Sequence, residues 1–370
     1  MMDVAFINRW GRGGGVIWDI EMAKHLQDLG VDVSFYIGKS KSTGFKHPVS
    51  EVERYITVPT IDLIDYSKAA PPGFGGMLRD IDLKLFVRRV NKKIDYSSYD
   101  VVHVNSLISL GEYIDSTPST IKLNGPPRSL WHDVINPYSS SYDRLGCFDQ
   151  IIATGITTAR VESETDHEVT TVNPGVDETR FIPDGLEADS SGPTILWVGR
   201  FAPVKNLNEL ILSFNKLRNT GIDAELVLVG DGPLRSDIER KAEKYNIRDS
   251  IRFEGYISHE KLPSFYRGAD IFALSSRHES FGMVLLEAMA CGTPVVAPQI
   301  DYIPEIVSDR QTGLLYESGD SNDMYVKMRK LLENSKRRRK MGQNAREAVV
   351  STFTWKQQAE KLISCYEQII

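Results

Sequence analysis

Cysteine is scarce in this chain of 370 residues, and long apolar runs are missing. The three cysteines, Cys147, Cys291 and Cys365, are odd in number and far apart, so they form neither a metal site nor a disulfide framework. This usage indicates a reducing compartment. No stretch approaches the roughly 18 apolar residues of a membrane span, and the chain opens on strand-like residues rather than a secretory signal. We therefore expect a cytoplasmic protein, with peripheral contact at the cytoplasmic membrane face left open.

An excess of positive charge is also missing. The formal net charge is −6 and the pI is near 5.7, which argues against a nucleic-acid-binding protein. Hydrophobic residues make up 41% and charged residues 25%, a globular composition. The length exceeds one ordinary core and suggests two domains.

Short β-branched runs alternate with helical patterns along the chain. Strands are expected in the first half at 3–8, 31–38, 100–106, 120–125 and 149–155, and in the second half at 194–199, 224–230, 250–253, 269–276 and 293–297. Such alternation predicts parallel sheets with both faces covered. A stretch rich in Pro, Gly, Ser and Asp at 181–193 reads as a linker. We expect an α/β fold of two doubly wound, Rossmann-like domains, 1–185 and 186–352, with ligands at the carboxyl ends of the strands.

The stretch HESFGMVLLEAMACGTPVV, residues 278–296, places two glutamates around a glycine. Gly282 is expected at a helix N-terminus, where free backbone N–H groups and the helix dipole favour an anion such as phosphate. Glu279 in the loop and Glu287 one turn into the helix are good acceptors for sugar hydroxyls. The combination suggests a nucleotide-sugar site, although two glutamates alone also fit an ordinary exposed helix.

Two cations follow an expected strand in WVGRFAPVKNL, residues 197–207. Arg200 and Lys205 precede a helix that Asn206 is expected to cap. At the carboxyl end of a strand, such a pair can hold a diphosphate and stabilise its charge as it leaves. Arg and Lys are also common in surface loops. Arg200 and Lys205 are therefore assigned to a diphosphate site only because the same expected sheet carries Glu279, Gly282 and Glu287.

The chain resembles retaining glycosyltransferases of the two-Rossmann GT-B architecture, in the large fourth family of their sequence classification. The matching segments are 173–183, 199–206, 229–235, 253–276, 278–297, 305–315 and 353–368. The last of these resembles the family's terminal helix, which implies that 353–370 crosses back onto the first domain. The resemblance implies a metal-independent, retaining transfer of a hexosyl group from a nucleotide-diphosphate sugar to a hydroxyl acceptor, with no cofactor.

The resemblance also implies the roles of individual residues. Glu279 would face the sugar, Glu287 the ribose, and Arg200 and Lys205 the diphosphate, while Tyr256 and Ile257 would lie along the nucleobase. The remaining donor-side residues that it implies are Gly14, Gly15, Gly230, Phe281, Gly282 and Met283. Arg200, Lys205 and Glu279 are the expected catalytic residues of the second domain.

A glycine cluster in RWGRGGGVIWDI, residues 9–20, raises a dinucleotide site as an alternative. A full G-x-G-x-x-G pattern would need glycine at Val16, and the next strand ends in Gly38-Lys39 rather than in an acid. An NAD site is therefore not expected. The resemblance implies that residues 13–15 lie against the donor phosphates, and a turn that needs positive φ is the competing explanation.

The expected catalytic centre of the first domain departs from the family. His103 occupies the first position of a common His-x-His pattern, but Asn105 stands in the second, and Asn124 replaces another frequent histidine. His103 is a candidate catalyst or a packed core histidine. Asn105 and Asn124 could orient an acceptor by hydrogen bonds but cannot act as general bases.

Two further patterns concern partners. Asp80 and Asp82 form an Asp-x-Asp pattern without a preceding strand, so solvated acids are expected and no metal. Residues 83–94 place an apolar stripe beside basic residues, which fits an anionic membrane surface or, as the favoured reading, packing into the first domain. The basic run 336–340 is expected to be a solvated helix surface.

Two other functions stay open at this stage, a nucleotide-sugar epimerase on the same fold and a nucleotide-sugar-binding protein with weak or no catalysis. The base, the sugar, the linkage and the oligomeric state do not follow from the sequence. The acceptor is a glycan, a lipid-linked saccharide or a small metabolite.

Overall fold

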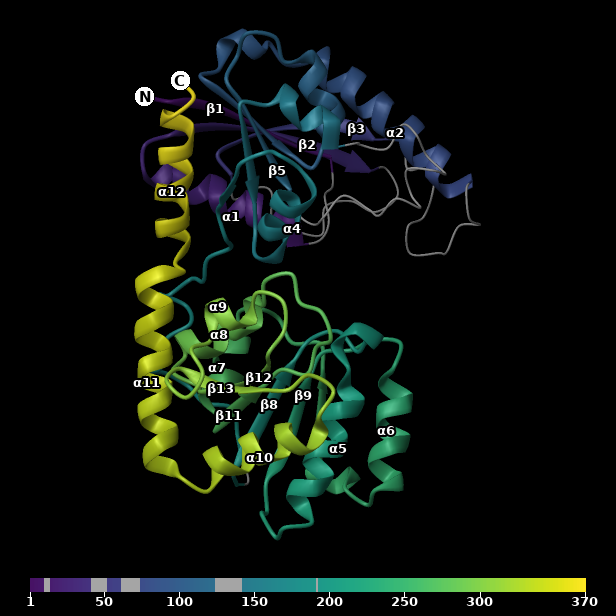
Figure 1. The fold of residues 1–370 in the computed structure, drawn as a ribbon, viewed down its shortest axis with the longest axis vertical. Helices are drawn as coiled ribbons and strands as arrows, with labels where there is room; N and C mark the ends of the chain where they lie inside the picture. The colour runs from purple at the N-terminus through teal and green to yellow at the C-terminus, as the bar shows by residue number, and fades with distance from the viewer. Residues whose placement is uncertain (10–13, 41–51, 61–73, 124–141, 191) are drawn as a thin grey trace. The chain divides into compact units, whose positions relative to one another are not determined.

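The computed structural model describes residues 1–9, 14–40, 52–60, 74–123, 142–190 and 192–370. The chain forms two compact units, Met1–Asn173 with Trp355–Ile370, and Pro174–Thr354. Each unit contains a parallel β-sheet covered by helices (Figure 1). The predicted α/β class with two Rossmann-like domains is confirmed.

The first unit is built on a parallel sheet whose described strands run in the order β3-β2-β1-β4-β5-β6-β7. Strands β4 and β5 are buried at every residue, as expected for the centre of a sheet that is covered on both faces. The strands are Asp3–Asn8 (β1), Asp32–Ser40 (β2), Arg54–Thr60 (β3), Val101–Asn105 (β4), Ser119–Leu123 (β5), Gln150–Ala153 (β6) and Val169–Thr171 (β7).

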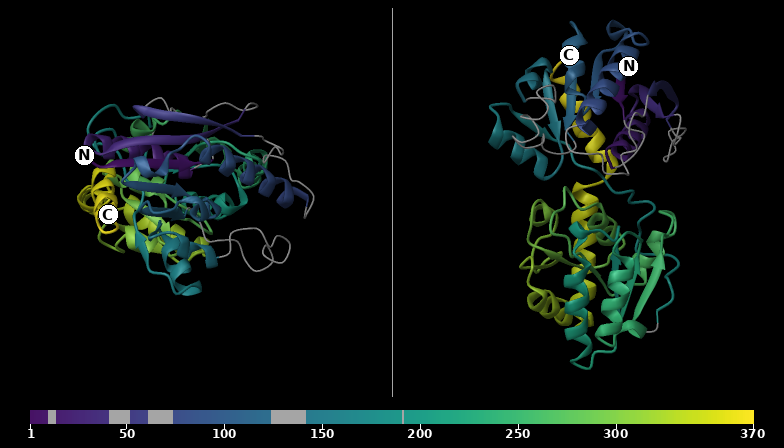
Figure 2. Two further views of the ribbon diagram at one scale, coloured as in Figure 1. Left: turned by 90° about the horizontal axis from the view of Figure 1, so that it is seen from above. Right: turned by 90° about the vertical axis from the view of Figure 1, so that its right-hand side faces the viewer.

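Among the described residues, the α-helices that accompany this sheet are Gly14–Asp28 (α1), Phe74–Asn91 (α2), Ile156–Glu164 (α4) and Trp355–Glu367 (α12). The C-terminal helix α12 lies against α1 (Figure 2). The rings of Trp355 and His25 are 6.4 Å apart. Gln358 of α12 also accepts the backbone N–H of Asn173 at 3.0 Å. The last helix of the chain is thus part of the first unit.

The apolar stripe of α2 and the turn after it belongs to the core of the first unit. Phe86, Val87, Val90 and Ile94 are each less than 8% exposed and pack in one cluster with residues of the sheet. The membrane surface considered for residues 83–94 is therefore corrected, because the face that would enter a membrane is covered by the protein's own sheet. No described helix is long and apolar enough to cross a bilayer.

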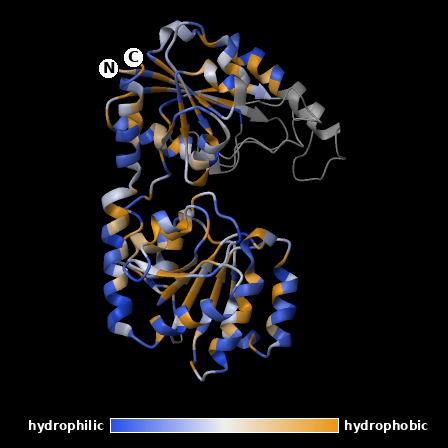
Figure 3. Cartoon of the chain, in the orientation of Figure 1, coloured by the Kyte–Doolittle hydropathy of each residue, from blue (hydrophilic) through white to orange (hydrophobic). Residues whose placement is uncertain are grey.

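The second unit is built on a parallel sheet whose described strands run in the order β10-β9-β8-β11-β12-β13. Hydrophobic residues concentrate in these strands, whereas the helices α6 and α11 are mostly hydrophilic on the outside (Figure 3). The strands are Thr194–Val198 (β8), Glu225–Val229 (β9), Ile251–Gly255 (β10), Ile271–Ala273 (β11), Val295–Pro298 (β12) and Gly313–Tyr316 (β13). The helices are Leu207–Arg218 (α5), Arg235–Lys244 (α6), Leu262–Arg267 (α7), Met283–Ala290 (α8), Ile303–Ile306 (α9), Ser321–Leu332 (α10) and Ser335–Thr352 (α11).

The division between the units lies before the boundary expected at residue 185. Residues after Asn173 already pack with the second unit, because the Val176 N–H donates to the Phe353 carbonyl at 2.8 Å and Phe181 is 1% exposed in the second unit's core. Arg346 of α11 also donates to the Phe181 carbonyl at 2.9 Å. The stretch 181–193, although rich in turn residues, is attached to the second unit at its first residue.

Candidate active site

The order of the second sheet defines where a ligand is expected. Strands β9 and β10 lie on one side of β8, and β11, β12 and β13 lie on the other. The order in which strands are added to the sheet therefore reverses between β8 and β11. In open parallel sheets, ligands bind outside the carboxyl ends of the two strands at such a switch point. The loop after β8 carries Arg200 and Lys205, and the loop after β11 carries Glu279.

Lys205 and Glu279 form an ion pair that joins these two loops. The Lys205 Nζ lies 2.6 Å from Oε2 of Glu279, and their side chains are 22% and 15% exposed. The Ser276 hydroxyl donates to the same carboxylate oxygen at 3.0 Å. Ser275 Oγ donates to the Lys205 carbonyl at 2.8 Å, which ties the backbones together. The structure therefore brings these two predicted site residues together and fixes both.

Arg200 lies in the same loop, directly after β8, and is exposed. Its guanidinium makes no ion pair with any residue in the described part of the chain. Lys205 already has an anionic partner, whereas the Arg200 guanidinium remains available to bind an anion at this edge of the sheet.

Gly282 precedes α8 and adopts a left-handed conformation with φ of 101°. A Cβ atom at this position would lie 3.1 Å from Ile303 Cδ1 and 3.2 Å from Leu285 Cδ1, so both backbone and space favour glycine. The N-terminal amides of α8 begin here, as predicted. The Phe281 side chain belongs to the hydrophobic core cluster, and the partly buried Met283 packs against it.

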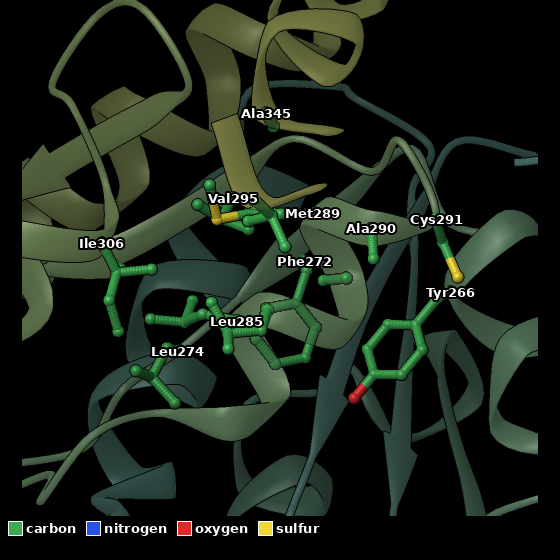
Figure 4. Packing of buried hydrophobic residues seen from close by; sticks show 14 of the residues in the cluster. Tyr266, Phe272, Leu274, Leu285, Met289, Ala290, Cys291, Val295, Ile306 and Ala345 are labelled. Carbon is green, nitrogen blue, oxygen red and sulfur yellow. The ribbon is translucent and has the colours of Figure 1, made fainter. Parts of the chain in front are cut away.

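Glu287 lies inside α8 and is 6% exposed. The buried Tyr266 hydroxyl donates to Oε2 of Glu287 at 2.7 Å, and the His259 Nε2 lies 3.1 Å from its Oε1. Burial and the nearby Glu287 charge raise the pKa of Tyr266 well above its usual value. The Tyr266 hydroxyl points away from its core neighbour Cys291 (Figure 4). Each carboxylate oxygen of Glu287 can still accept one further hydrogen bond.

The tautomer of His259 follows from its second partner. Arg180 Nη1 lies 3.1 Å from Nδ1 of this imidazole, and an arginine can only donate. Nδ1 therefore accepts, and Nε2 carries the proton that it donates to Glu287. Neither His259 nor Tyr266 was predicted as a site residue, since neither belongs to the motif around Glu279 and Glu287.

The other expected donor-side positions follow β9 and β10. Gly230 has φ of 122°, and a Cβ there would lie 1.9 Å from the Gly199 carbonyl oxygen, so only glycine allows the two loops to approach this closely. The Tyr256 ring is 84% exposed, whereas Ile257 packs against the core. An exposed aromatic ring at this edge is suited to stacking on a base.

His103 of the first unit is completely buried in β4. Its Nδ1 lies 2.9 Å from both the Thr120 hydroxyl and the Tyr366 hydroxyl, and its ring stacks on Trp18 at 5.7 Å. Burial, with a smaller contribution from the Lys122 charge, lowers the pKa of His103 well below its usual value of 6.5. These surroundings are those of a neutral core histidine, and they give no support to a catalytic role.

Asn105 belongs to a buried polar cluster that the sequence did not predict, defined here as Asn8, Asp19, Asn105 and Lys122. The Asn105 amide donates to both Asp19 oxygens at 2.7 Å, and Asn8 donates to Oδ2 at 2.5 Å. Burial raises the pKa of Asp19 to about 6, against the lowering effect of Lys122 and the two amides. Burial likewise lowers the pKa of Lys122 to about 8, against the charge of Asp19. The amide group of Asn105 is therefore already engaged by Asp19.

The remaining predicted positions are placed as follows. Gly14 and Gly15 begin α1, and Asn124 lies outside the described residues. Asp80 and Asp82 lie in α2, but their side chains are outside the described part. Within the described residues, no group of three or more His, Cys, Asp or Glu is arranged to hold a metal ion.

Known proteins that resemble this chain include glycosyltransferases and a related synthase. Residues 178–348 match the family model described as glycosyl transferases group 1. N-acetyl-alpha-D-glucosaminyl L-malate synthase of Bacillus anthracis is 35% identical over 175 residues, which cover 47% of this chain and 44% of that relative. D-inositol 3-phosphate glycosyltransferase 2 of Catenulispora acidiphila is 28% identical over 402 residues, with 97% of this chain and 90% of the relative covered.

The fold extends over the whole chain. An Anabaena protein solved in complex with UDP superimposes with a TM-score of 0.76 at 17% identity, covering 99% of this chain and 100% of that one. At this identity the likeness concerns the fold. The second unit matches the glycosyl transferases group 1 over residues 178–348, and the chain has the GT-B fold of two Rossmann-like domains.

Proposed function

We propose that this chain transfers a sugar from a nucleotide-diphosphate sugar to a hydroxyl acceptor. The observation that carries the proposal is the Lys205–Glu279 pair at 2.6 Å, held at the switch point of the second sheet beside the exposed Arg200. This arrangement puts two cations that can bind a diphosphate next to a fixed carboxylate that can accept hydrogen bonds from sugar hydroxyls. The Anabaena neighbour that was solved with UDP supports a nucleotide ligand.

In this proposal, each part of the donor has its own residue. Arg200 and Lys205 bind the diphosphate, assisted by the N-terminal amides of α8. Glu279 accepts hydrogen bonds from the sugar hydroxyls, and Glu287 accepts from the ribose with the lone pairs that Tyr266 and His259 leave available. The exposed ring of Tyr256 stacks on the base.

The reaction follows from these contacts. The acceptor oxygen forms a bond to the anomeric carbon, and the bond from that carbon to the diphosphate oxygen breaks, with its electron pair leaving on the phosphate. The two cations stabilise the developing negative charge, which makes a metal ion unnecessary in this proposal. The acceptor proton passes to the departing phosphate on the same face of the sugar, so that the anomeric configuration is retained.

Glu279 is poorly suited to be a covalent nucleophile. Its Oε2 is held by both the Lys205 ammonium and the Ser276 hydroxyl, which lower its reactivity and fix its direction. This supports direct attack by the acceptor rather than a glycosyl-enzyme intermediate. The relatives named for L-malate and inositol 3-phosphate favour a small hydroxyl compound as acceptor, with glycans and lipid-linked saccharides as the other classes.

The test uses UDP, GDP and ADP and their glucose derivatives in a thermal-shift panel, followed by turnover with the best donor. Arg200→Ala and Lys205→Ala should each lower turnover by about a hundredfold, since an interaction with a charged group contributes about 3 kcal/mol. Lys244→Ala, an exposed lysine of α6, is the matched control. Full activity of either variant, or conversion of the donor to an epimer without acceptor, would contradict the proposal.

A further inference from the structure

Residues 299–303, here called the bracing loop, comprise the four residues that connect β12 to α9 and the first residue of α9. Asp301 in this loop has φ of 46°, in the left-handed region that residues other than glycine seldom adopt. Its side chain is 15% exposed. A strained residue of this kind persists only when its surroundings hold it, and such residues cluster at functional sites.

The Asp301 carboxylate is bonded to the loop that carries Glu279. Its Oδ2 accepts the backbone N–H of Glu279 at 2.8 Å and lies 3.7 Å from Nδ1 of the exposed His278. The strain at Asp301 therefore coincides with a hydrogen bond to the residue that the proposed function assigns to the sugar.

The next two residues of the bracing loop contact the same neighbouring loop. The Tyr302 ring packs on the Phe281 ring at 5.6 Å with 31° between their planes. Ile303 Cδ1 lies 3.1 Å from the place where Gly282 would carry a Cβ. Three consecutive residues thus support the turn from β11 into α8 along its length.

Glu279 is consequently held from two sides. Lys205 and Ser276 bind its carboxylate, and Asp301 binds its backbone amide. The direction of a side chain depends on the backbone that carries it, and shifts of about 0.5 Å already matter at such sites.

We propose that Asp301 is the positioning residue that aims Glu279 at the donor sugar. This inference rests on the proposed function and adds that sugar recognition and nucleotide recognition are separable. The backbone that carries Lys205 is held independently of Asp301. Ser275 Oγ donates to the Lys205 carbonyl, and the Arg277 N–H donates to the Val204 carbonyl at 2.8 Å.

Two substitutions separate the carboxylate from the backbone conformation. Asp301→Gly keeps the left-handed conformation available and removes the acceptor. Asp301→Asn tolerates the same conformation and keeps a carbonyl oxygen for the Glu279 amide. Asp309→Asn is the matched control, because Asp309 accepts the N–H of Leu315 at 2.9 Å in a different loop.

The measurement is the ratio of two dissociation constants, for UDP-glucose and for UDP, or for the corresponding GDP or ADP pair if that base binds. Loss of one hydrogen bond that orients a charged group should weaken binding of the nucleotide-sugar about tenfold relative to binding of the diphosphate in Asp301→Gly. Asp301→Asn and the Asp309 control should keep the wild-type ratio.

Each outcome has a distinct meaning. The positioning role is overturned if Asp301→Gly leaves the ratio of the two dissociation constants unchanged. It is also overturned if Asp301→Asn melts like wild type yet changes that ratio. Both results leave the proposed function standing. Failure of the wild-type protein to bind any of the diphosphates or nucleotide-sugars overturns the proposed function itself.

Discussion

Replacing Glu279 with glutamine should have opposite effects on the two halves of the donor. In the structure the Lys205 ammonium is bound to the Glu279 carboxylate at 2.6 Å, with both side chains less than a quarter exposed. An entering diphosphate therefore competes with this carboxylate for the lysine. Glutamine keeps a carbonyl oxygen for Lys205 and Ser276 but has no charge.

The size of each effect follows from the bonds involved. A hydrogen bond to a charged group contributes about 1.5–3 kcal/mol, and a neutral one about 1 kcal/mol. Weakening the internal competitor by roughly 1 kcal/mol should tighten nucleoside diphosphate binding about fivefold. Loss of the charged acceptor for the sugar hydroxyls should lower turnover of the nucleotide-sugar about a hundredfold.

Isothermal titration with the nucleoside diphosphate and a turnover assay with its sugar give the two numbers. Lys205→Ala should weaken diphosphate binding and lower turnover. Glu317→Gln, at an exposed position of the same unit, should change neither. The reasoning is wrong if Glu279→Gln weakens diphosphate binding as much as Lys205→Ala does. The Glu279 carboxylate would then help Lys205 to bind the diphosphate rather than compete with the diphosphate for Lys205.

Three further predictions concern stability. Folding raises the Asp19 pKa from 3.8 to about 6. The protonated carboxyl therefore contributes to the free energy of unfolding in full below pH 3.8, and this contribution is lost as the pH rises to 6. Wild type should lose about 3 kcal/mol in this window relative to Asp19→Asn in urea unfolding, and parallel curves would contradict this. Lys122→Met should cost about 3–5 kcal/mol by removing the positive charge that stabilises the buried Asp19 carboxylate, and Asp19→Leu with Lys122→Met should cost less; additive losses would refute this electrostatic coupling. Gly282→Ala should cost about 1–3 kcal/mol, visible as a lower Tm, and an unchanged Tm would show that the turn relaxes freely.

Much of the second unit was predictable because its signals are local. The helix expected to begin at Gly282 is α8, Met283–Ala290, and the strand at 194–199 is β8 with one residue less. Local signals were weaker at helix starts. Asn206 does stand before α5, but in a left-handed conformation, and its amide donates to Glu209 instead of capping the helix.

The strands that were not predicted depend on pairing rather than on pattern. β7 has only three residues, and β3 carries Pro59 and charged or polar residues along an edge of the sheet. β13 begins with Gly313 and was recognised only as part of a family motif. Short edge strands take their conformation from the neighbouring strand, which no local window contains.

The candidate site shows the same division. The sequence indicated that Arg200, Lys205 and Glu279 follow strands of one parallel sheet, and carboxyl ends of such strands meet at one edge. It could not indicate that Lys205 binds Glu279, or that Asp301 holds the Glu279 amide, because these contacts span 74 and 22 residues. His103 fits a catalytic motif equally well whether it faces a ligand or the core, and only its burial distinguishes the two.

Left-handed backbone conformations follow every described strand of the second sheet. These positions are Asn206, Gly230, Gly255, Gly282, Asp301 and Gly319. Elsewhere in the unit, left-handed residues such as Gly221 and Gly292 follow helix ends, where that conformation is ordinary. Gly230, Asp301 and Gly319 lie within three residues of a strand end and Gly255 is the last residue of β10, whereas Asn206 and Gly282 stand directly before α5 and α8. The arrangement of the proposed donor site therefore resides in the backbone and its bracing contacts, and truncating Arg200 or Lys205 should remove turnover without unfolding the unit.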